Sequence, residues 1–193
     1  LSFSDVDLTD AHLVSATGTP IGSVLGSLSA VKNSDTTGSG AGGQLTRTYT
    51  VANSAVEYLA AGQAKIESFT VTLNDKHGGL ITKQIDVTIT GSNDVPVVAT
   101  ADVSGAVTEA IAAVGNLTDS GAIGFTDVDL TDIHSLSAIA PSSGTLGTLT
   151  ASVSTDTTGS GLGGVVSWNY SVAAAAVEYL AAGQTKVETF GFN

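Results

Sequence analysis

ESFTVTLNDKHGGLITKQIDVTIT, residues Glu67–Thr90, is the stretch that decides the fold class. In its first part Phe69, Val71 and Leu73 alternate with polar residues, and in its second part apolar side chains alternate again around Ile85. A period of two is typical of strands that are buried on one face only. The polar segment NDKHGG between the two parts contains residues that favour a turn. The sequence therefore predicts an antiparallel hairpin.

Most of the remaining sequence is a duplication. AVEYLAAGQ at 55–63 returns unchanged at 176–184, and SDTTGSG returns as TDTTGSG at the same offset of 121 residues. A period of this length is too long for the repeat of a solenoid, and it matches an ordinary domain of about 100–150 residues. We therefore expect two tandem domains of the same kind.

The boundary between the two domains is expected within TGSNDVPVV at 90–98, because its Gly, Asn, Asp and Pro residues interrupt one strand and start another. This assigns 1–94 to the first repeat and 95–193 to the second. The first repeat has no counterpart of the opening strand region, and the second stops before the closing strands. Richness in Thr, Val, Ser and Gly with few aromatic residues predicts an all-β fold of tandem Ig-like antiparallel β-sandwiches.

Composition limits the partners of the chain. Six Lys and Arg against eighteen Asp and Glu give a net charge of −12, which argues against nucleic acid or an anionic membrane as partner. No apolar run reaches the roughly 18 residues of a membrane span, so no membrane insertion is expected. Cysteine and methionine are absent, which excludes disulfides and thiolate metal sites. Any bound metal is therefore expected to be a hard cation held by oxygen atoms.

The acidic motif points to such a cation. FSDVDLTD at 3–10 returns as FTDVDLTD at 125–132, each with three carboxylates within six positions. Carboxylates gathered this closely repel one another unless a cation lies between them, and calcium accepts six to eight oxygen ligands at flexible angles. We predict Ca²⁺, with ligands from both motifs, the junction and the start of the second repeat: Asp5, Asp7, Asp10, Asn93, Asp94, Glu109, Asp127, Asp129 and Asp132.

The alternative interpretation of this motif is a solvated acidic turn that binds nothing. The spacing is not that of an EF-hand, because no Gly occupies the sixth position from Asp127 and no Glu occupies the twelfth. A calcium site would therefore have to be assembled from separate segments.

No catalytic residue is predicted, and the chain is not expected to be an enzyme. His12 and His134 follow the acidic motifs, but no nucleophile constellation surrounds them, so turn or packing roles are expected. GSGAGG at 38–43 and GSGLGG at 159–164 match the GxGxxG pattern. Dinucleotide binding needs a helix after these glycines, whereas an alternating strand pattern follows here, so they are expected to be flexible loops between strands.

The remaining notable side chains are expected to have structural roles or to be solvated. Trp168 alternates with Tyr170, which favours packing over an exposed platform for a sugar. Tyr58 and its copy Tyr179 are expected to pin the crossing between strands. Glu67, together with its copy, follows a lysine by two positions, and an exposed pair of this kind contributes little to stability. His77 in the hairpin turn is expected to be solvated.

With these residues in view, the sequence resembles the VCBS-type repeat, a cadherin-like module found in tandem in very long bacterial surface proteins and adhesins. The resemblance rests on FTDVDLTDIH, on AVEYLAAGQ with the strands that follow it, and on ITGSNDVPVV. It covers nearly the whole chain. SNDVP also resembles the calcium-binding linker of cadherins, although it lacks a second Asn after Asp94.

The resemblance implies a function as a non-enzymatic extender domain that calcium rigidifies, in a protein at the bacterial cell surface used in adhesion or biofilm formation. Its partners would be the neighbouring repeats of the same chain. Two alternatives remain at this point. One is a self-assembling extracellular sheath or filament subunit, whose incomplete sandwiches are completed by strand addition. The other is a carbohydrate- or receptor-binding module.

Overall fold

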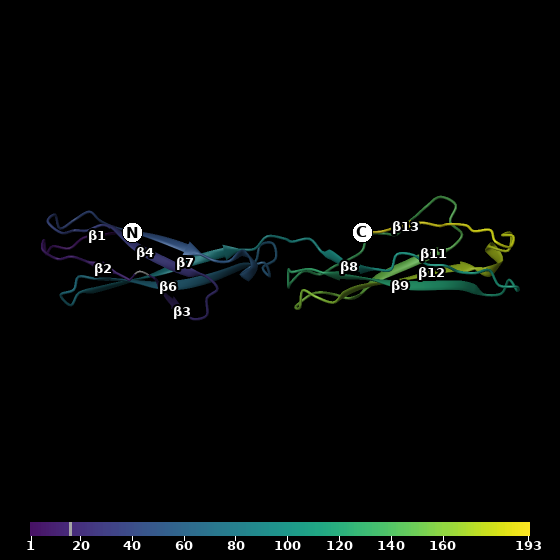
Figure 1. Ribbon diagram of the computed structural model, residues 1–193, viewed down its shortest axis with the longest axis horizontal. Helices are drawn as coiled ribbons and strands as arrows, with labels where there is room; N and C mark the ends of the chain where they lie inside the picture. The colour runs from purple at the N-terminus through teal and green to yellow at the C-terminus, as the bar shows by residue number, and fades with distance from the viewer. Residues whose placement is uncertain (16) are drawn as a thin grey trace. The chain divides into compact units, whose positions relative to one another are not determined.

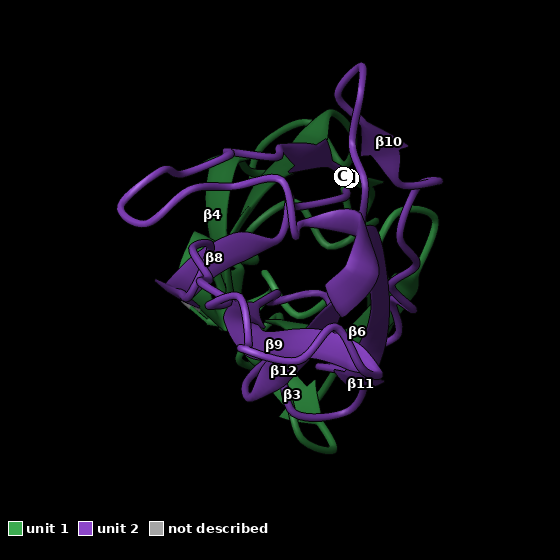
Figure 2. Cartoon of the chain, turned by 90° about the vertical axis from the view of Figure 1, so that its right-hand side faces the viewer, with its two compact units in different colours: residues 1–92 green, residues 93–193 purple. Residues whose placement is uncertain are grey.

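The computed structural model describes residues 1–15 and 17–193, and it is all-β as the sequence predicts. The chain divides into two compact units, Leu1–Ser92 and Asn93–Asn193 (Figure 2). The described residues form thirteen strands, β1 to β13, and two single 3₁₀ turns, η1 (Asn53–Ala55) and η2 (Ala174–Ala176) (Figure 1). All strand pairs among them are antiparallel. These residues contain no helix that is long and apolar enough to span a membrane.

The first unit contains two antiparallel sheets. One has the order β1-β5-β4, and the other has β6 at its centre with β7 along one edge and β2 and β3 along the opposite edge. The strand bounds are β1 Ser2–Phe3, β2 Leu13–Val14, β3 Thr19–Ile21, β4 Ser27–Ser34, β5 Gly43–Thr50, β6 Ala64–Asn74 and β7 Leu80–Thr90.

The hairpin predicted from Glu67–Thr90 is present as β6 and β7. The two strands pair over their whole length, with Asn74 opposite Leu80 and Phe69 opposite Ile85. The Asp75 carboxylate closes the turn, because it accepts hydrogen bonds from the backbone N–H groups of His77 and Gly79. Apolar side chains on one face of this hairpin form the core that the alternating pattern predicts.

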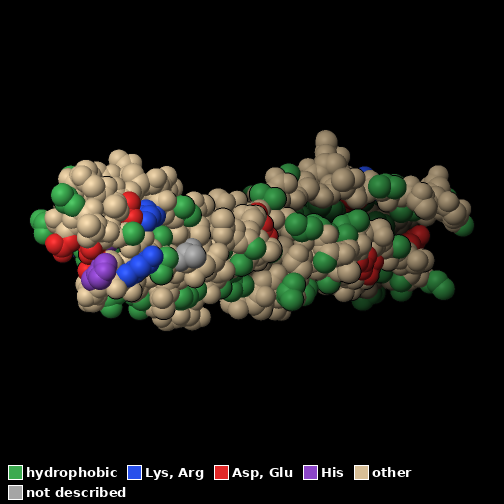
Figure 3. All heavy atoms as spheres, turned by 60° about the vertical axis from the view of Figure 1, so that its left-hand side comes forward, with side chains coloured by type: hydrophobic (Ala, Val, Ile, Leu, Met, Phe, Trp, Pro, Cys, Tyr) green, Lys and Arg blue, Asp and Glu red, His purple; other side chains and the backbone are tan. Residues whose placement is uncertain are grey.

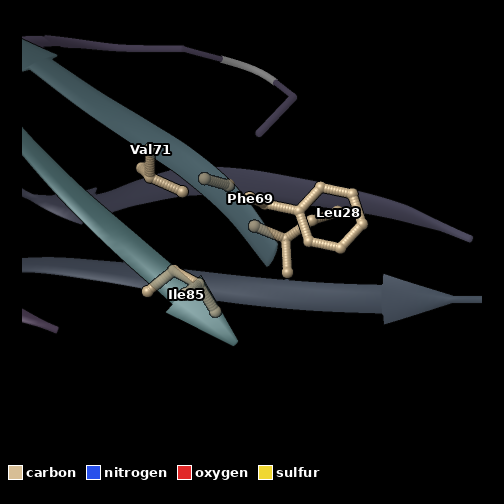
Figure 4. Packing of buried hydrophobic residues seen from close by; sticks show 5 residues of the cluster. Leu28, Phe69, Val71 and Ile85 are labelled. Carbon is tan, nitrogen blue, oxygen red and sulfur yellow. The ribbon is translucent and has the colours of Figure 1, made fainter. Parts of the chain in front are cut away.

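That core lies between the two sheets of the first unit (Figure 4). Leu28 and Ala30 come from β4, Phe69 and Val71 from β6, and Ile85 from β7, and all five are buried. Because both sheets supply inward side chains to one cluster, the unit is sandwich-like.

The second unit has one large sheet and one small one. The large sheet has the order β11-β12-β9-β8, and the small sheet pairs β10 with β13. The strand bounds are β8 Val97–Ala101, β9 Asn116–Thr126, β10 Ala140–Pro141, β11 Thr148–Thr155, β12 Gly164–Ala173 and β13 Phe190–Gly191. Trp168 of β12 is only 8% exposed, and its indole N–H donates to the Asp102 carbonyl at 2.6 Å. The predicted packing role of Trp168 is therefore confirmed, and its ring is not available for stacking on a sugar.

The prediction for Glu67 is wrong, since this side chain is 1% exposed. Its carboxylate accepts hydrogen bonds from the backbone N–H groups of Leu25 (2.6 Å) and Gly26 (3.0 Å) and from the Tyr49 hydroxyl (2.8 Å). We call this arrangement the carboxylate pin, because it fixes the loop before β4 to the centre of β6. A Cβ atom on Gly26 would lie 2.2 Å from the Tyr49 oxygen, so the pin needs glycine there.

The second unit repeats the carboxylate pin. Glu188 accepts from the N–H groups of Leu146 (2.6 Å) and Gly147 (3.1 Å) and from the Tyr170 hydroxyl (3.0 Å). The tyrosines that pin strands are therefore those of β5 and β12. Tyr58 and Tyr179 do not have the expected role, because no hydrogen bond from either hydroxyl is present in the described part of the chain, and Tyr179 is exposed.

The pin shifts the ionisation of its members. Burial alone would raise the pKa of Glu67, but the hydrogen bonds from Leu25, Gly26 and Tyr49 outweigh burial and lower this pKa. Burial and the adjacent carboxylate raise the pKa of Tyr49 to about 12. The same causes lower the pKa of Glu188 and raise that of Tyr170 to about 12.

Candidate metal centres

Each acidic motif is a tight turn held by its own backbone. In the first unit the Asp7 N–H donates to the Asp5 carboxylate at 2.9 Å, and in the second the Asp129 N–H donates to the Asp127 carboxylate at 3.0 Å. One turn further on, the N–H of the third aspartate donates to the carbonyl of the second, from Asp10 to Asp7 and from Asp132 to Asp129. The two copies therefore have the same local structure.

The glycine-rich loops support these turns. The Asp5 N–H donates to the Gly40 carbonyl at 3.1 Å, and the Thr37 hydroxyl donates to the Asp10 carbonyl at 2.6 Å. Gly40 has a φ of 73°, and a Cβ atom there would lie 3.0 Å from the Asp5 carbonyl oxygen. These glycines do lie in loops between strands, as predicted, but the loop packs against the acidic motif.

A histidine bridges two carboxylates beside each motif. His12 lies 3.0 Å through Nε2 from Asp5 and 2.7 Å through Nδ1 from Asp35. His134 lies 3.0 Å from Asp127 and 2.6 Å from Asp156 through the same two nitrogens. Burial tends to lower the pKa of His134, but its bonds to Asp156 and Asp127 outweigh burial and raise this pKa.

The histidines therefore have a more specific role than the packing that the sequence predicts. Each one orients the first aspartate of its motif and connects that motif to the start of the glycine-rich loop. Asp35 also forms an ion pair with Lys32. Burial alone would raise the pKa of Asp35, but the hydrogen bonds from Lys32 and His12 outweigh burial and lower this pKa. Asp35 and Asp156 were not identified from the sequence, where each appears only as the second residue of SDTTGSG or TDTTGSG.

In the first unit the carboxylates that meet are those of Asp5, Asp10 and Asp75. Each offers an oxygen, and these oxygens lie within 4.8 Å of one another. Asp75 joins them because Leu13 of β2 pairs with Asn74 of β6, which places the residues before β2 beside those after β6. We call these three residues the first-unit triad.

Two sequence-based expectations change in the first unit. Asp7 is exposed and lies outside the first-unit triad. His77 is not merely solvated, because its Nδ1 lies 3.2 Å from the Asp10 carboxylate. Figure 3 shows acidic side chains (red) beside histidine (purple) and basic (blue) side chains on this unit.

In the second unit the first two aspartates of the acidic motif are buried. Asp129 is 0% exposed and Asp127 is also buried. One oxygen of Asp129 accepts the N–H of Asp94 at 2.7 Å, whereas its other oxygen, Oδ1, has no hydrogen-bond partner among the described residues. Asp94 lies two residues after Ser92, so the first residues of the second unit cover this motif. We call Asp94, Asp127 and Asp129 the second-unit site.

Three other residues predicted as ligands, Asn93, Glu109 and Asp132, are not part of the second-unit site. Asn93 and Glu109 are exposed, and the Asn93 amide donates to the neighbouring Asp94 carbonyl. The carbonyl of Asp132 accepts from the Thr158 hydroxyl at 2.6 Å.

The donor set fits a hard cation. Both sites present carboxylate oxygens. The buried Asp129 Oδ1 has no hydrogen-bond partner in the part of the chain that the structure describes, and leaving it unpaired costs free energy unless something binds it. Calcium tolerates incomplete protein shells because water can complete its coordination.

A comparison with models of known protein families finds no match, and a comparison with curated proteins finds none either. Function is therefore inferred from the residues and geometry of this chain.

Proposed function

We propose that the chain is a calcium-binding, non-enzymatic extender module of a long bacterial surface adhesin, built from tandem Ig-like, cadherin-like β-sandwich repeats. The observation that carries this proposal is the Asp129 carboxylate, which is 0% exposed and has one oxygen with no hydrogen-bond partner in residues 1–15 and 17–193. The resemblance to the VCBS-type repeat supports the same class of protein.

Burying a carboxylate that has an oxygen without a hydrogen-bond donor lowers the free energy of unfolding. Removing an ionised group from water is compensated only when a counter-charge and hydrogen bonds replace the water. At the second-unit site the Asp94 N–H satisfies one oxygen of Asp129, and the nearby His134 already serves Asp127 and Asp156. A divalent cation at Oδ1 supplies the missing counter-charge, and the hard oxygen ligands favour calcium over softer metals.

Binding at this position has a mechanical consequence. Asp94 belongs to the segment that follows the first unit, so an ion that fixes Asp129 and Asp94 also orders the connection between consecutive repeats. Extracellular modules bind calcium with dissociation constants on the order of 10⁻⁴ to 10⁻³ M, which matches the calcium outside cells. The proposed role is thus to stiffen a string of repeats at the cell surface. The first-unit triad is proposed as a second, more exposed calcium site.

Thermal and urea unfolding with and without calcium tests the proposal. At 10 mM calcium, dissociation constants of 0.1 to 1 mM correspond to a stabilisation of about 1.4 to 2.7 kcal/mol by mass action. Trp168 is the single tryptophan and lies in the second unit, so its fluorescence follows unfolding of that unit. Solution scattering with calcium and with chelator should show a stiffer particle when calcium is present.

The variants Asp129→Asn and Asp7→Asn form a matched pair, since Asp7 is the same position in the first copy but is exposed. Asp129→Asn should abolish the calcium-dependent shift in the Trp168 transition while leaving the calcium-free protein at least as stable, because the uncompensated charge is removed. Asp7→Asn should keep the shift. A wild-type protein whose unfolding transitions are the same in calcium and in chelator would refute the proposal.

A further inference from the structure

We propose that His77 adds a nitrogen ligand to the first-unit triad, and that this site also binds a divalent first-row transition ion such as zinc, which displaces calcium there. The second-unit site keeps calcium. The inference rests on the proposed function in one respect, since it takes the first-unit triad as a metal site. It assigns to that site a second kind of ion.

Asp10 is the triad member that most needs a positive charge beside it. It is 6% exposed, and its carboxylate accepts no hydrogen bond from the residues that the structure describes. The Nδ1 atom of His77 lies 3.2 Å from this carboxylate. Because a buried carboxylate without hydrogen bonds costs free energy, an ion at the point where the three carboxylates converge compensates this cost.

The ring of His77 is available to an ion, unlike the rings of the other two histidines. His12 and His134 each use both ring nitrogens to contact two carboxylates. The His77 side chain is 68% exposed, and its ring forms no hydrogen bond within residues 1–15 and 17–193. Neutral imidazole is a ligand of zinc, copper and nickel, whereas calcium takes oxygen ligands. The expectation of an all-oxygen site therefore leaves out one nitrogen donor.

The turn between β6 and β7 holds this donor in place. The Asp75 carboxylate accepts the N–H groups of His77 at 2.7 Å and of Gly79 at 2.8 Å, and the Lys76 N–H donates to the Asn74 side chain at 2.7 Å. Lys76 has a φ of 68°, a left-handed conformation that residues other than glycine seldom adopt. Two ligands of the proposed site, Asp75 and His77, are thus ordered before an ion arrives, so little further ordering opposes binding.

The distances at the site suit two ions of different size. Calcium–oxygen bonds of about 2.3–2.6 Å place ligands on opposite sides of the ion about 4.6–5.2 Å apart, and the three carboxylate oxygens lie within 4.8 Å of one another. Zinc–ligand bonds of about 2.0–2.2 Å place neighbouring atoms of a tetrahedral site about 3.3–3.6 Å apart. The 3.2 Å between His77 Nδ1 and the Asp10 carboxylate is close to that spacing. Zinc therefore draws the carboxylates together, and its four ligands are Asp5, Asp10, Asp75 and His77.

The nitrogen ligand decides which ion binds more tightly. Sites with mixed nitrogen and oxygen ligands hold zinc more strongly than manganese, and calcium gains nothing from an imidazole. Zinc should therefore displace calcium from the first-unit triad. The second-unit site presents carboxylates, and its neighbour His134 is held between Asp127 and Asp156, so calcium should stay there.

Calorimetry on the complete chain without an affinity tag tests the proposal, with zinc titrated into the calcium-loaded protein. We expect one zinc per chain to displace the calcium of the first unit, while the calcium response of Trp168 persists. His77→Asn removes the nitrogen ligand and leaves an amide oxygen that calcium accepts. Zinc affinity should then fall about tenfold or more while calcium affinity is unchanged. Thr82→Ala, an exposed position of β7, is the matched control and should bind both ions as the original chain does.

Nuclear magnetic resonance of the ring nitrogens distinguishes a metal ligand from a side chain that only neutralises Asp10. Zinc should shift the Nδ1 resonance of His77 and leave those of His12 and His134 in place. Unchanged zinc affinity in His77→Asn, or a His77 Nδ1 resonance that zinc does not move, would overturn the proposal.

Failure of this inference and failure of the calcium function give different results. Calcium binding to the first unit that zinc does not displace would overturn the inference and leave the calcium function standing. Zinc binding through His77 in a chain that shows no calcium response would do the opposite.

Discussion

Replacing Glu67 with alanine should unfold the first unit at a lower denaturant concentration and leave the second unit almost unchanged. The substitution removes a carboxylate that accepts hydrogen bonds from Leu25, Gly26 and Tyr49 in a place that is 1% exposed. Each of the three donors then lacks its partner, at a cost of about 1–3 kcal/mol per buried group.

Part of this cost is offset, because the carboxylate itself no longer has to be removed from water on folding. Breaking a buried, hydrogen-bonded charge network by removing one member typically costs about 3–5 kcal/mol, and we expect the Glu67→Ala change in the free energy of unfolding to fall in that range. Glu188→Ala should cost less, because Glu188 is only partly buried and water can reach the donors left behind.

The two variants control for each other in one urea titration. Trp168 fluorescence follows the second unit, and hydrogen exchange at the amides of Leu25 and Gly26 follows the first. Glu67→Ala should shift the exchange of these amides and leave the Trp168 transition unchanged, whereas Glu188→Ala should do the opposite. A loss below about 0.5 kcal/mol for Glu67→Ala, the level of an ordinary surface substitution, would refute the role given to the pin.

Two further predictions concern pH and the first-unit triad. Hydrogen bonding lowers the pKa of Glu67 and Glu188 in the folded chain. The stabilisation that these carboxylates contribute is therefore complete above the ordinary carboxyl pKa of 4.5 and is lost as pH falls through the lowered values. The urea midpoint of unfolding should drop in acid, and Glu67→Gln should make that drop smaller. Asp75→Asn should weaken calcium binding to the first unit by calorimetry while the calcium response of Trp168 persists; equal heats in both proteins would contradict the triad.

Local patterns in the sequence predicted the parts of the fold that depend on neighbouring residues. The alternation around Phe69 and Ile85 is a property of each strand by itself, and the polar turn between them fixes their pairing. The inward position of Trp168 follows from the same alternation. These features need no information about distant segments.

The residues whose roles the sequence predicted wrongly are those that contact segments distant in the sequence. Glu67 lies in a strand beside a lysine, and its burial is decided by a loop 42 residues away. Asp75 meets Asp10 only because β2 pairs with the end of β6. Asp7 and Asp129 occupy identical motifs, yet Asp129 alone is buried, because Asp94 lies over it. Sequence pattern alone could not have ranked these carboxylates as ligands.

The packing of the glycine-rich loops against the acidic turns bears on how such repeats can be engineered. The Gly38 N–H donates to the Leu8 carbonyl, and the Gly40 carbonyl accepts from the Asp5 N–H. A segment whose composition is that of a flexible linker is therefore hydrogen-bonded to the acidic motif. An epitope tag or fluorescent protein inserted into this loop would break these hydrogen bonds. The loop around Gly144 is constrained as well, because Gly144 has a φ of 75° and lies two residues before Leu146, whose N–H is held by the Glu188 carboxylate.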